Sequence, residues 1–254
     1  MKVFDQYARY YDLLYRDKDY RGETDFVLSL LQDHAPGSKR IFEMGCGTGI
    51  HAQMLAEAGH TVHGIDFSDT MLATAAERRQ GLAAELQERL SFDSGDVRTY
   101  RAGRSFDVVL SLFHVFSYQT ANADLQAAFA TAASHLNSGG VFIFDYWYGP
   151  AVLVQRPETR IKRMQDGGLS ILRMAESNVD DIRNVVEVNY ETIVTVEGFS
   201  ESIFESHKMR YLFIPEIQIF AENNGFEAVN HRAWMAGAVP SFSSWSVCSV
   251  LKKL

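Results

Sequence analysis

The first 150 residues alternate between short apolar runs, typical of buried strands, and segments with apolar residues at helical spacing. A helix is predicted over residues 24–32, ahead of the first strand. The expected strands are 40–44, 61–65, 90–94, 106–111 and 141–146, with helices at 50–57, 68–79 and 123–136. Because apolar strands alternate with helices, the pattern predicts a doubly wound α/β fold with a mostly parallel sheet.

The pattern changes after the fifth strand, near Gly149. Residues 158–213 form extended segments rich in Val, Ile, Thr and Tyr, interrupted by Gly and Asp pairs that are typical of hairpin turns. Helical spacing returns at 215–224, and two strands follow at 226–234 and 244–252. The prediction is one domain of residues 1–149 and 214–254 that carries an antiparallel insertion of three or four strands, residues 150–213.

Composition narrows the classes of protein. The 254 residues are 46% hydrophobic and 22% charged, which suits one domain with a full core. The net charge of -8 and the lack of a long Lys/Arg run disfavour a nucleic-acid partner. Cys46 and Cys248 are too few for a disulfide framework, and no apolar stretch approaches membrane-spanning length. Since the N-terminus has charges where a signal peptide needs an apolar core, a cytoplasmic protein is expected.

One segment carries most of the functional information. Residues 41–49 read I-F-E-M-G-C-G-T-G, an apolar run that ends in three alternating glycines. Glycine permits a tight turn and lets the backbone pass close to a ligand. A nicotinamide or flavin site favours G-x-G-x-x-G, but Ile50 occupies the third glycine position. Glu43 would repel a pyrophosphate and accept hydrogen bonds from an ammonium group, so the turn predicts a nucleoside ligand with an amine.

Two further carboxylates stand where predicted strands end. Asp66 closes the second strand in H-G-I-D-F-S, where a carboxylate can accept hydrogen bonds from both ribose hydroxyls. Asp66 could instead cap the next helix, although Ser68 is the better cap candidate. Asp96 ends the third strand in S-G-D-V, a sequence also common in ordinary turns. Because the carboxyl ends of parallel strands share one edge, these carboxylates and Glu43 are expected at one site.

With these carboxylates, the segment E-M-G-C-G-T-G resembles the first motif, E/D-x-G-x-G-x-G, of class I S-adenosylmethionine-dependent methyltransferases. The resemblance implies a Rossmann-like sheet, S-adenosyl-L-methionine as cofactor and S-adenosyl-L-homocysteine as product. It also implies that Asp96 and Val97 read the adenine while Phe67 and Met71 pack beside it. The implied cofactor-binding residues are Tyr20, Glu43, Gly45, Cys46, Gly47, Gly49, Asp66, Phe67, Met71, Asp96, Val97 and Leu112.

In this superfamily the end of the fourth strand, here F-H-V-F-S-Y, lies beside the reactive methyl group. Methyl transfer requires alignment of the acceptor and, where needed, removal of its proton, so His114 and Tyr118 are the catalytic candidates. Tyr118 could orient an amine that arrives neutral, whereas a hydroxyl acceptor would need a base such as His114. The sulfonium already has a good leaving group, so no metal is expected, and His60 and His63 are interpreted as surface or packing residues.

A narrower resemblance rests on Y-A-R-Y-Y-D-L-L-Y-R-D-K-D-Y near the N-terminus and S-H-K-M-R-Y-L-F late in the chain. Both are similar to nucleotide-linked amino-sugar N,N-dimethyltransferases and glycine N-methyltransferases. The likeness implies Tyr11 as a lid residue near the sulfonium and Tyr20 as a partner of the cofactor carboxylate, unless both are core residues. It places Arg210 in the acceptor pocket, unless that strand is a solvated face. Tyr148 could stack on the acceptor, or simply pack.

The function expected is methyl transfer to nitrogen or oxygen of a small molecule, above all a nucleotide-linked or polysaccharide-precursor sugar, with the insertion over the acceptor site. Glycine-type or other small-amine N-methylation is the alternative among enzymes. A binding or regulatory subunit that keeps the cofactor pocket without turnover is the alternative from another class. The acceptor, the number of methyl groups and the oligomeric state stay open, a homodimer included.

Overall fold

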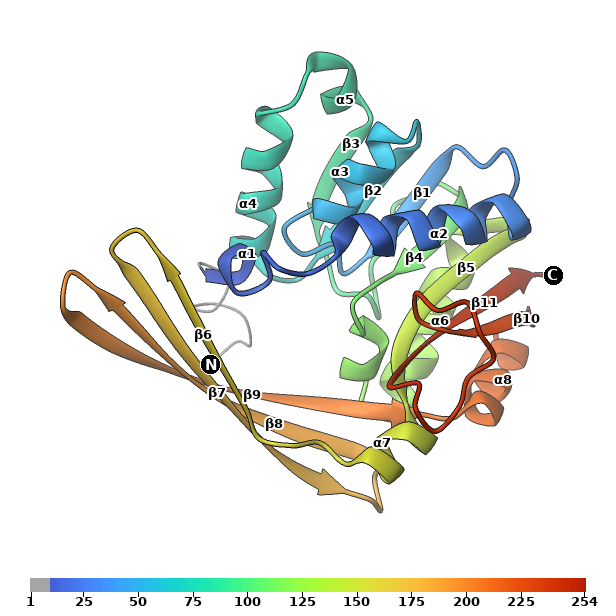
Figure 1. Ribbon diagram of the computed structural model, residues 1–254. Coiled ribbons are helices and arrows are strands. Elements are labelled where there is room, and N and C mark those ends of the chain that lie inside the picture. Colours follow the sequence, from blue (N-terminus) through green and yellow to red (C-terminus); the bar gives the residue numbers. More distant parts are fainter. Residues whose placement is uncertain (1–9) are drawn as a thin grey trace.

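The computed structural model describes residues 10–254, which build a sheet with a parallel centre and antiparallel extensions (Figure 1). Five parallel strands lie in the order β3-β2-β1-β4-β5. Antiparallel β11 pairs with β5, and β10 pairs with β11. The strands are β1 (Arg40–Met44), β2 (Thr61–Asp66), β3 (Leu90–Ser94), β4 (Phe106–Ser111), β5 (Leu136–Tyr148), β10 (Phe226–Ala233) and β11 (Ser246–Lys253). This order gives the predicted doubly wound α/β fold.

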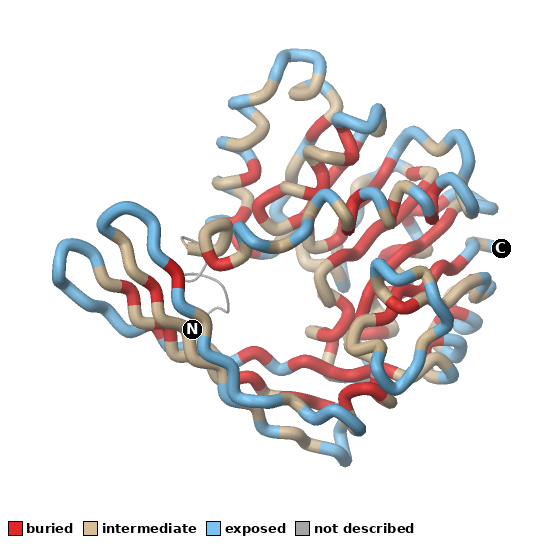
Figure 2. The backbone as a smooth tube through the Cα atoms, in the orientation of Figure 1, coloured by how far each residue is buried: buried red, intermediate tan, exposed pale blue. Residues whose placement is uncertain are grey.

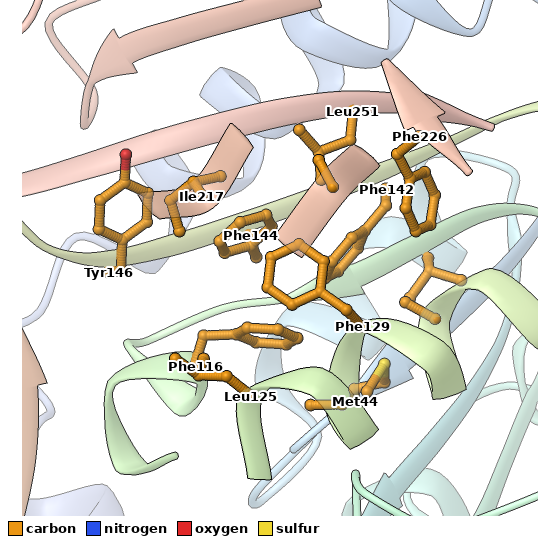
Figure 3. Packing of buried hydrophobic residues seen from close by; sticks show 14 of the residues in the cluster. Met44, Phe116, Leu125, Phe129, Phe142, Phe144, Tyr146, Ile217, Phe226 and Leu251 are labelled. Atoms are coloured by element: carbon orange, nitrogen blue, oxygen red, sulfur yellow. The ribbon is translucent and has the colours of Figure 1, made fainter. Parts of the chain in front are cut away.

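Helices bury both faces of the parallel sheet because neighbouring strand residues point to opposite sides. On one face, Phe42 belongs to a cluster with residues of α6 (Asn122–Ser134) and α8 (Ile214–Asn223). Figure 3 shows part of this cluster, including Phe129 of α6 and Ile217 of α8. On the other face, Ile41 packs with α2 (Tyr20–His34) and α3 (Ile50–Glu57). The remaining helical elements are α1 (Tyr11–Leu14), α4 (Asp69–Gln80), α5 (Ala84–Glu88), the 3-10 helix η2 (Val115–Tyr118) and α7 (Gly149–Gln155).

Four antiparallel strands form the insertion between α7 and α8. They are β6 (Arg160–Asp166), β7 (Leu169–Asp180), β8 (Val185–Val196) and β9 (Phe199–Leu212). This sheet joins β5 through the pairs Trp147–Tyr211 and Tyr148–Leu212, and it extends away from the parallel sheet (Figure 1). Its outer hairpin ends are exposed, whereas positions nearer α1 are buried (Figure 2). The insertion thus reaches back over the N-terminal helix.

Most predicted element bounds agree with the structure within two residues, and the largest differences lie at the start of α2, which begins at Tyr20 rather than at residue 24, and before β5. The helix that was expected to reach residue 136 ends at Ser134, and β5 begins at Leu136 rather than at 141. Within residues 10–254, no helix is both long and apolar enough to cross a membrane. The predictions that concern residues 1–9 fall outside the part of the chain that the structure describes.

Candidate functional site

A cavity of about 920 Å³ lies at the carboxyl ends of the parallel strands, bounded by α1 and the insertion. Most residues expected at the site line it. From the predicted set they are Tyr11, Tyr20, Gly45, Cys46, Gly47, Asp66, Phe67, Met71, Asp96, Val97, Leu112, His114 and Tyr118. Glu43, Gly49, Tyr148 and Arg210 do not line it. A volume of this size suits two small ligands held together.

The glycine turn shapes the floor of the cavity. Gly45, Gly47 and Gly49 all have positive φ, at 81°, 54° and 75°. A Cβ on Gly45 would lie 2.5 Å from a methyl of Val115, whereas a Cβ on Gly47 would meet no protein atom within 4 Å. Gly47 therefore leaves its space to whatever the cavity binds. Gly49 has a different task, because it is the left-handed N-cap of α3 and packs near Phe92.

Asp66 ties the second strand to this turn. Its Oδ2 accepts a hydrogen bond from Gly47 N at 3.0 Å, and its Oδ1 accepts from Ser68 N at 2.9 Å. Burial raises the pKa of Asp66, and these backbone hydrogen bonds oppose that rise. Ser68, rather than Asp66, caps α4, because its Oγ accepts from Met71 N. The expectation that Ser68 is the cap is confirmed, which leaves Asp66 facing the cavity.

Asp96 lies at the end of β3 with a cation beside it. Arg98 Nη2 is 2.5 Å from Asp96 Oδ2, and Arg98 Nη1 reaches Asp124 Oδ1 at 3.0 Å. The hydrogen bond from the Arg98 side chain holds the pKa of Asp96 below its ordinary value. The carboxylate is therefore ionised at neutral pH and can accept a further hydrogen bond from a ligand.

Helix α1 crosses the cavity from the glycine turn to the insertion. At one end, Asp12 accepts from Thr48 Oγ1 at 2.8 Å and pairs with Arg78 at 2.6 Å. At the other end, Lys162 Nζ donates to the Leu14 carbonyl at 2.5 Å. These contacts hold the cavity-lining tyrosines of α1 over the site. The lid position implied for Tyr11 has this helix as its support.

A buried charged cluster that sequence reasoning missed adjoins the cavity. Glu23 accepts from Lys18 and from Trp234 Nε1, and its Oε2 lies 2.9 Å from His51 Nε2. Burial lowers the pKa of Lys18 to about 8 against the opposing influence of nearby carboxylates. Burial, followed by the charge of Lys18, lowers the pKa of His51 to about 3. His51 is therefore neutral when it faces the cavity.

His114 is held by a carboxylate that the sequence did not single out. Asp145 Oδ1 accepts from His114 N at 2.9 Å, and Asp145 Oδ2 lies 2.7 Å from His114 Nδ1. Burial alone would raise the pKa of Asp145, but His114 and Lys18 keep it below its ordinary value. Phe113 and His114 both have left-handed backbone, with φ of 66° and 65°, a strained pair at the end of β4. Asp145 thus stabilises the turn that points His114 at the cavity.

Tyr118 has a different kind of partner. Its hydroxyl is 2.7 Å from His207 Nδ1, and His207 Nε2 is 3.1 Å from Glu205 Oε2. His207 lines the cavity, and Glu205 lies two residues away on the same side of β9 without lining it. The insertion therefore adds a histidine to the cavity wall, with a carboxylate as its partner.

Comparison with known proteins identifies the part of the chain that carries the glycine turn. Residues 41–140, which carry the glycine turn, Asp66 and Asp96, match the family described as a methyltransferase domain. The fold agrees over almost the whole chain with an S-adenosylmethionine-dependent methyltransferase from Clostridium acetobutylicum, with a TM-score of 0.82 at 21% identity over 99% of both chains. Residues 41–140 therefore form a methyltransferase domain, and the whole chain has the fold of an S-adenosylmethionine-dependent methyltransferase.

Curated relatives of this methyltransferase act on sugars according to their names. A dTDP-3-amino-3,6-dideoxy-alpha-D-glucopyranose N,N-dimethyltransferase from Streptomyces fradiae is 29% identical over 80% of this chain and 76% of the relative. A dTDP-3-amino-3,4,6-trideoxy-alpha-D-glucopyranose N,N-dimethyltransferase from Streptomyces venezuelae is 32% identical over 57% of this chain. That second match spans 58% of the relative, little more than half of its length.

The cavity of this methyltransferase fits its cofactor, S-adenosylmethionine. Gly47 leaves room against the turn, and Asp66 and Asp96 present carboxylate oxygens to the cavity. Glu43 stands behind the turn and is 1% exposed. Among the described residues, its Oε2 has no hydrogen-bond partner. Burial raises the pKa of Glu43 to about 8, with a smaller contribution from Asp66, so an approaching ammonium group would ionise it.

Two residues expected to contact the acceptor point elsewhere. Arg210 is buried beside η2 and α8, where it donates to the Thr120 carbonyl at 3.2 Å and pairs with Glu216. On β5 the cavity is lined by Trp147 rather than by Tyr148. In both strands the expected residue sits next to one that does line the cavity, because adjacent strand residues face opposite sides.

Replacing Asp66 by Ala should weaken binding of S-adenosylmethionine by about 1–3 kcal/mol, the usual loss for hydrogen bonds to a charged group. The change also removes the acceptor of Gly47 N, so Asp66→Asn serves as the matched variant that keeps one carbonyl oxygen. Calorimetric titration measures both. Unchanged affinity in Asp66→Ala would remove Asp66 from the cofactor site.

Proposed function

We propose that this methyltransferase transfers methyl groups to the amino group of a nucleotide-linked amino sugar. The observation that carries the proposal is the acceptor side of the cavity, where the insertion contributes Arg160, Lys162 and Arg173 beside the aromatic ring of Tyr190. Arginine and lysine suit the phosphates of a nucleotide, and an aromatic face suits a sugar or base. The activities that name both dTDP-amino-sugar relatives support the same acceptor class.

Residues 150–213 are proposed to form the acceptor-covering part of a single enzyme whose cofactor half is residues 1–149 and 214–254. The basic side chains come from β6 and β7, whereas the glycine turn and the carboxylates come from the parallel sheet. S-adenosylmethionine supplies a methyl group on a sulfonium, which leaves as a neutral thioether. The protein's part is to exclude water, align the acceptor nitrogen and keep its lone pair available.

Nitrogen is proposed over oxygen because of what surrounds His114. Its Nδ1 contacts Asp145, and its Nε2 lies 3.4 Å from Ser246 Oγ, so both ring nitrogens face protein partners. A hydroxyl acceptor needs a strong base at its oxygen, whereas an ammonium is far more acidic and needs only a weak proton receiver. The acceptor is proposed to be a small molecule throughout, since the net charge of -8 gives no general attraction for nucleic acid.

The test is calorimetric titration with S-adenosylmethionine and S-adenosylhomocysteine, followed by turnover with three acceptors. These are dTDP-3-amino-3,6-dideoxyglucose, its matched counterpart with a hydroxyl at carbon 3, and glycine. Methylation of the amino sugar alone is the expected result. Methylation of the hydroxyl compound or of glycine would replace the proposed acceptor, and cofactor binding without any turnover would favour a regulatory subunit.

A further inference from the structure

A hydrogen-bonded chain of three side chains leads from the cavity wall into the insertion. It begins at Tyr118 on η2, continues through His207 and ends at Glu205 on β9. His207 is 3% exposed although it lines the cavity, and burial raises the pKa of Tyr118 well above its ordinary value. The tyrosine is therefore a poor base on its own and keeps its proton at neutral pH.

The Glu205 carboxylate sets the direction of both hydrogen bonds among these three side chains. A carboxylate only accepts, so the 3.1 Å contact requires a proton on His207 Nε2, which donates to Glu205 Oε2. A neutral imidazole with its proton on Nε2 has a lone pair on Nδ1. Nδ1 must then accept from the Tyr118 hydroxyl at 2.7 Å. The Tyr118 hydroxyl therefore already donates its proton to an acceptor, His207 Nδ1.

We infer that Tyr118, His207 and Glu205 form a proton relay for the acceptor amine, with Tyr118 as the catalytic residue and the other two as positioning residues. The inference rests on the proposed amino-sugar acceptor. As the acceptor, bound as an ammonium, gives up one proton to Tyr118 Oη, the hydroxyl proton of Tyr118 passes to His207 Nδ1 and the acceptor becomes a neutral amine. The imidazolium that results is balanced by Glu205, and the amine lone pair then forms the bond to the methyl carbon while the sulfur–carbon bond breaks.

A double methylation makes such a relay useful, because each methylated amine is an ammonium that must lose a proton before the next transfer. His114 offers no equivalent route, since its nitrogens face Asp145 and Ser246. The groups that also act on His207 come from three neighbouring elements. Tyr190 of β8 meets its ring edge-on at 5.0 Å, Arg173 of β7 lies over the Tyr190 ring, and Tyr15, directly after α1, acts on Tyr118.

The first measurement needs no acceptor. In protein labelled with ¹⁵N at histidine, His207 should show a protonated Nε2 and an unprotonated Nδ1 at neutral pH, and Tyr118→Phe should shift the Nδ1 resonance. A proton on Nδ1 would overturn the relay. This measurement uses no acceptor, so it tests the relay even if the proposed acceptor is wrong.

The second measurement is the pH dependence of kcat with dTDP-3-amino-3,6-dideoxyglucose. His207→Asn keeps an oxygen acceptor for Tyr118 but cannot take up a proton, so kcat should fall by about 10²–10⁴-fold and the shape of its pH profile should change. KM and the Kd for S-adenosylmethionine should stay within threefold. The kcat of Glu205→Gln should lie between those of the wild type and His207→Asn. His34→Asn, a control outside the cavity, should have the wild-type kcat.

A wild-type kcat and an unchanged pH profile in His207→Asn would overturn the relay. If the wild type itself does not methylate the amino sugar, the proposed acceptor fails, and the histidine tautomer then decides whether the hydrogen-bonded chain is arranged as inferred.

Discussion

Binding of S-adenosylmethionine at pH 7 should release close to one proton from the wild type and none from Glu43→Gln. Burial raises the pKa of Glu43 to about 8, so the carboxyl is mostly protonated at pH 7 before the ligand arrives. A neighbouring ammonium group favours the ionised form and expels the proton. Calorimetry in buffers of different ionisation enthalpy measures the number released. An equal release in both proteins would mean that the ammonium group is not near Glu43.

The same substitution should change the pH dependence of stability. In the wild type the folded state holds the Glu43 proton up to about pH 8, whereas the unfolded chain loses it near 4.5. The free energy of unfolding therefore falls as pH rises through this window, by up to about 1.4 kcal/mol per pH unit. Gln does not titrate, so the stability of the variant relative to the wild type should grow by roughly 3 kcal/mol from pH 5 to pH 8.

Denaturant unfolding without ligand at several pH values measures this difference. Burying the amide side chain of Glu43→Gln changes the free energy of unfolding by the same amount at every pH. It therefore does not alter how that free energy depends on pH. Glu88→Gln, an exposed carboxylate outside the cavity, is the matched control and should keep the wild-type slope. Parallel curves for wild type and Glu43→Gln would show that Glu43 is already ionised in the folded protein.

The cofactor half of the site was predictable because its signals are local in sequence. Glycines at alternating positions fix a turn, and Asp66 and Asp96 follow strands whose apolar pattern is unambiguous. The parallel topology then brings the strand ends together without further information. Ten of the twelve implied cofactor residues line the cavity. The other two, Glu43 and Gly49, sit behind the turn, since alternation along β1 and the start of α3 turn them away from its surface.

The acceptor half was not predictable in the same way, because it depends on pairing between distant strands. His207 meets Tyr118 across 89 positions of sequence, and this contact exists only once β9 has found its register. A register error of one residue moves a side chain to the opposite face of the strand. Asp145 could have been noticed from sequence, since it is a lone charge in the apolar run V-F-I-F-D-Y of a central strand. Such a charge requires a buried partner.

Asp145→Ala should lower the free energy of unfolding by about 1.5–3 kcal/mol, the range for hydrogen bonds to a charged group. The loss has two parts. His114 Nδ1 loses the carboxylate 2.7 Å away, and the His114 amide loses its acceptor at 2.9 Å. Asp145→Asn keeps an oxygen for the amide, so it should cost less, about 1–2 kcal/mol. Denaturant unfolding at pH 7 compares the two variants.

The pH dependence separates this pair from simple loss of packing. Because His114 and Lys18 hold the pKa of Asp145 below 3.8, the stabilisation is complete above that pH and is lost as pH falls through the folded pKa. The difference between wild type and Asp145→Ala should therefore be largest at neutral pH and shrink below about pH 4. A difference that stays constant down to pH 3 would mean that the charge contributes nothing. The left-handed turn at Phe113 and His114 would then be held by packing alone, and kcat should survive the substitution.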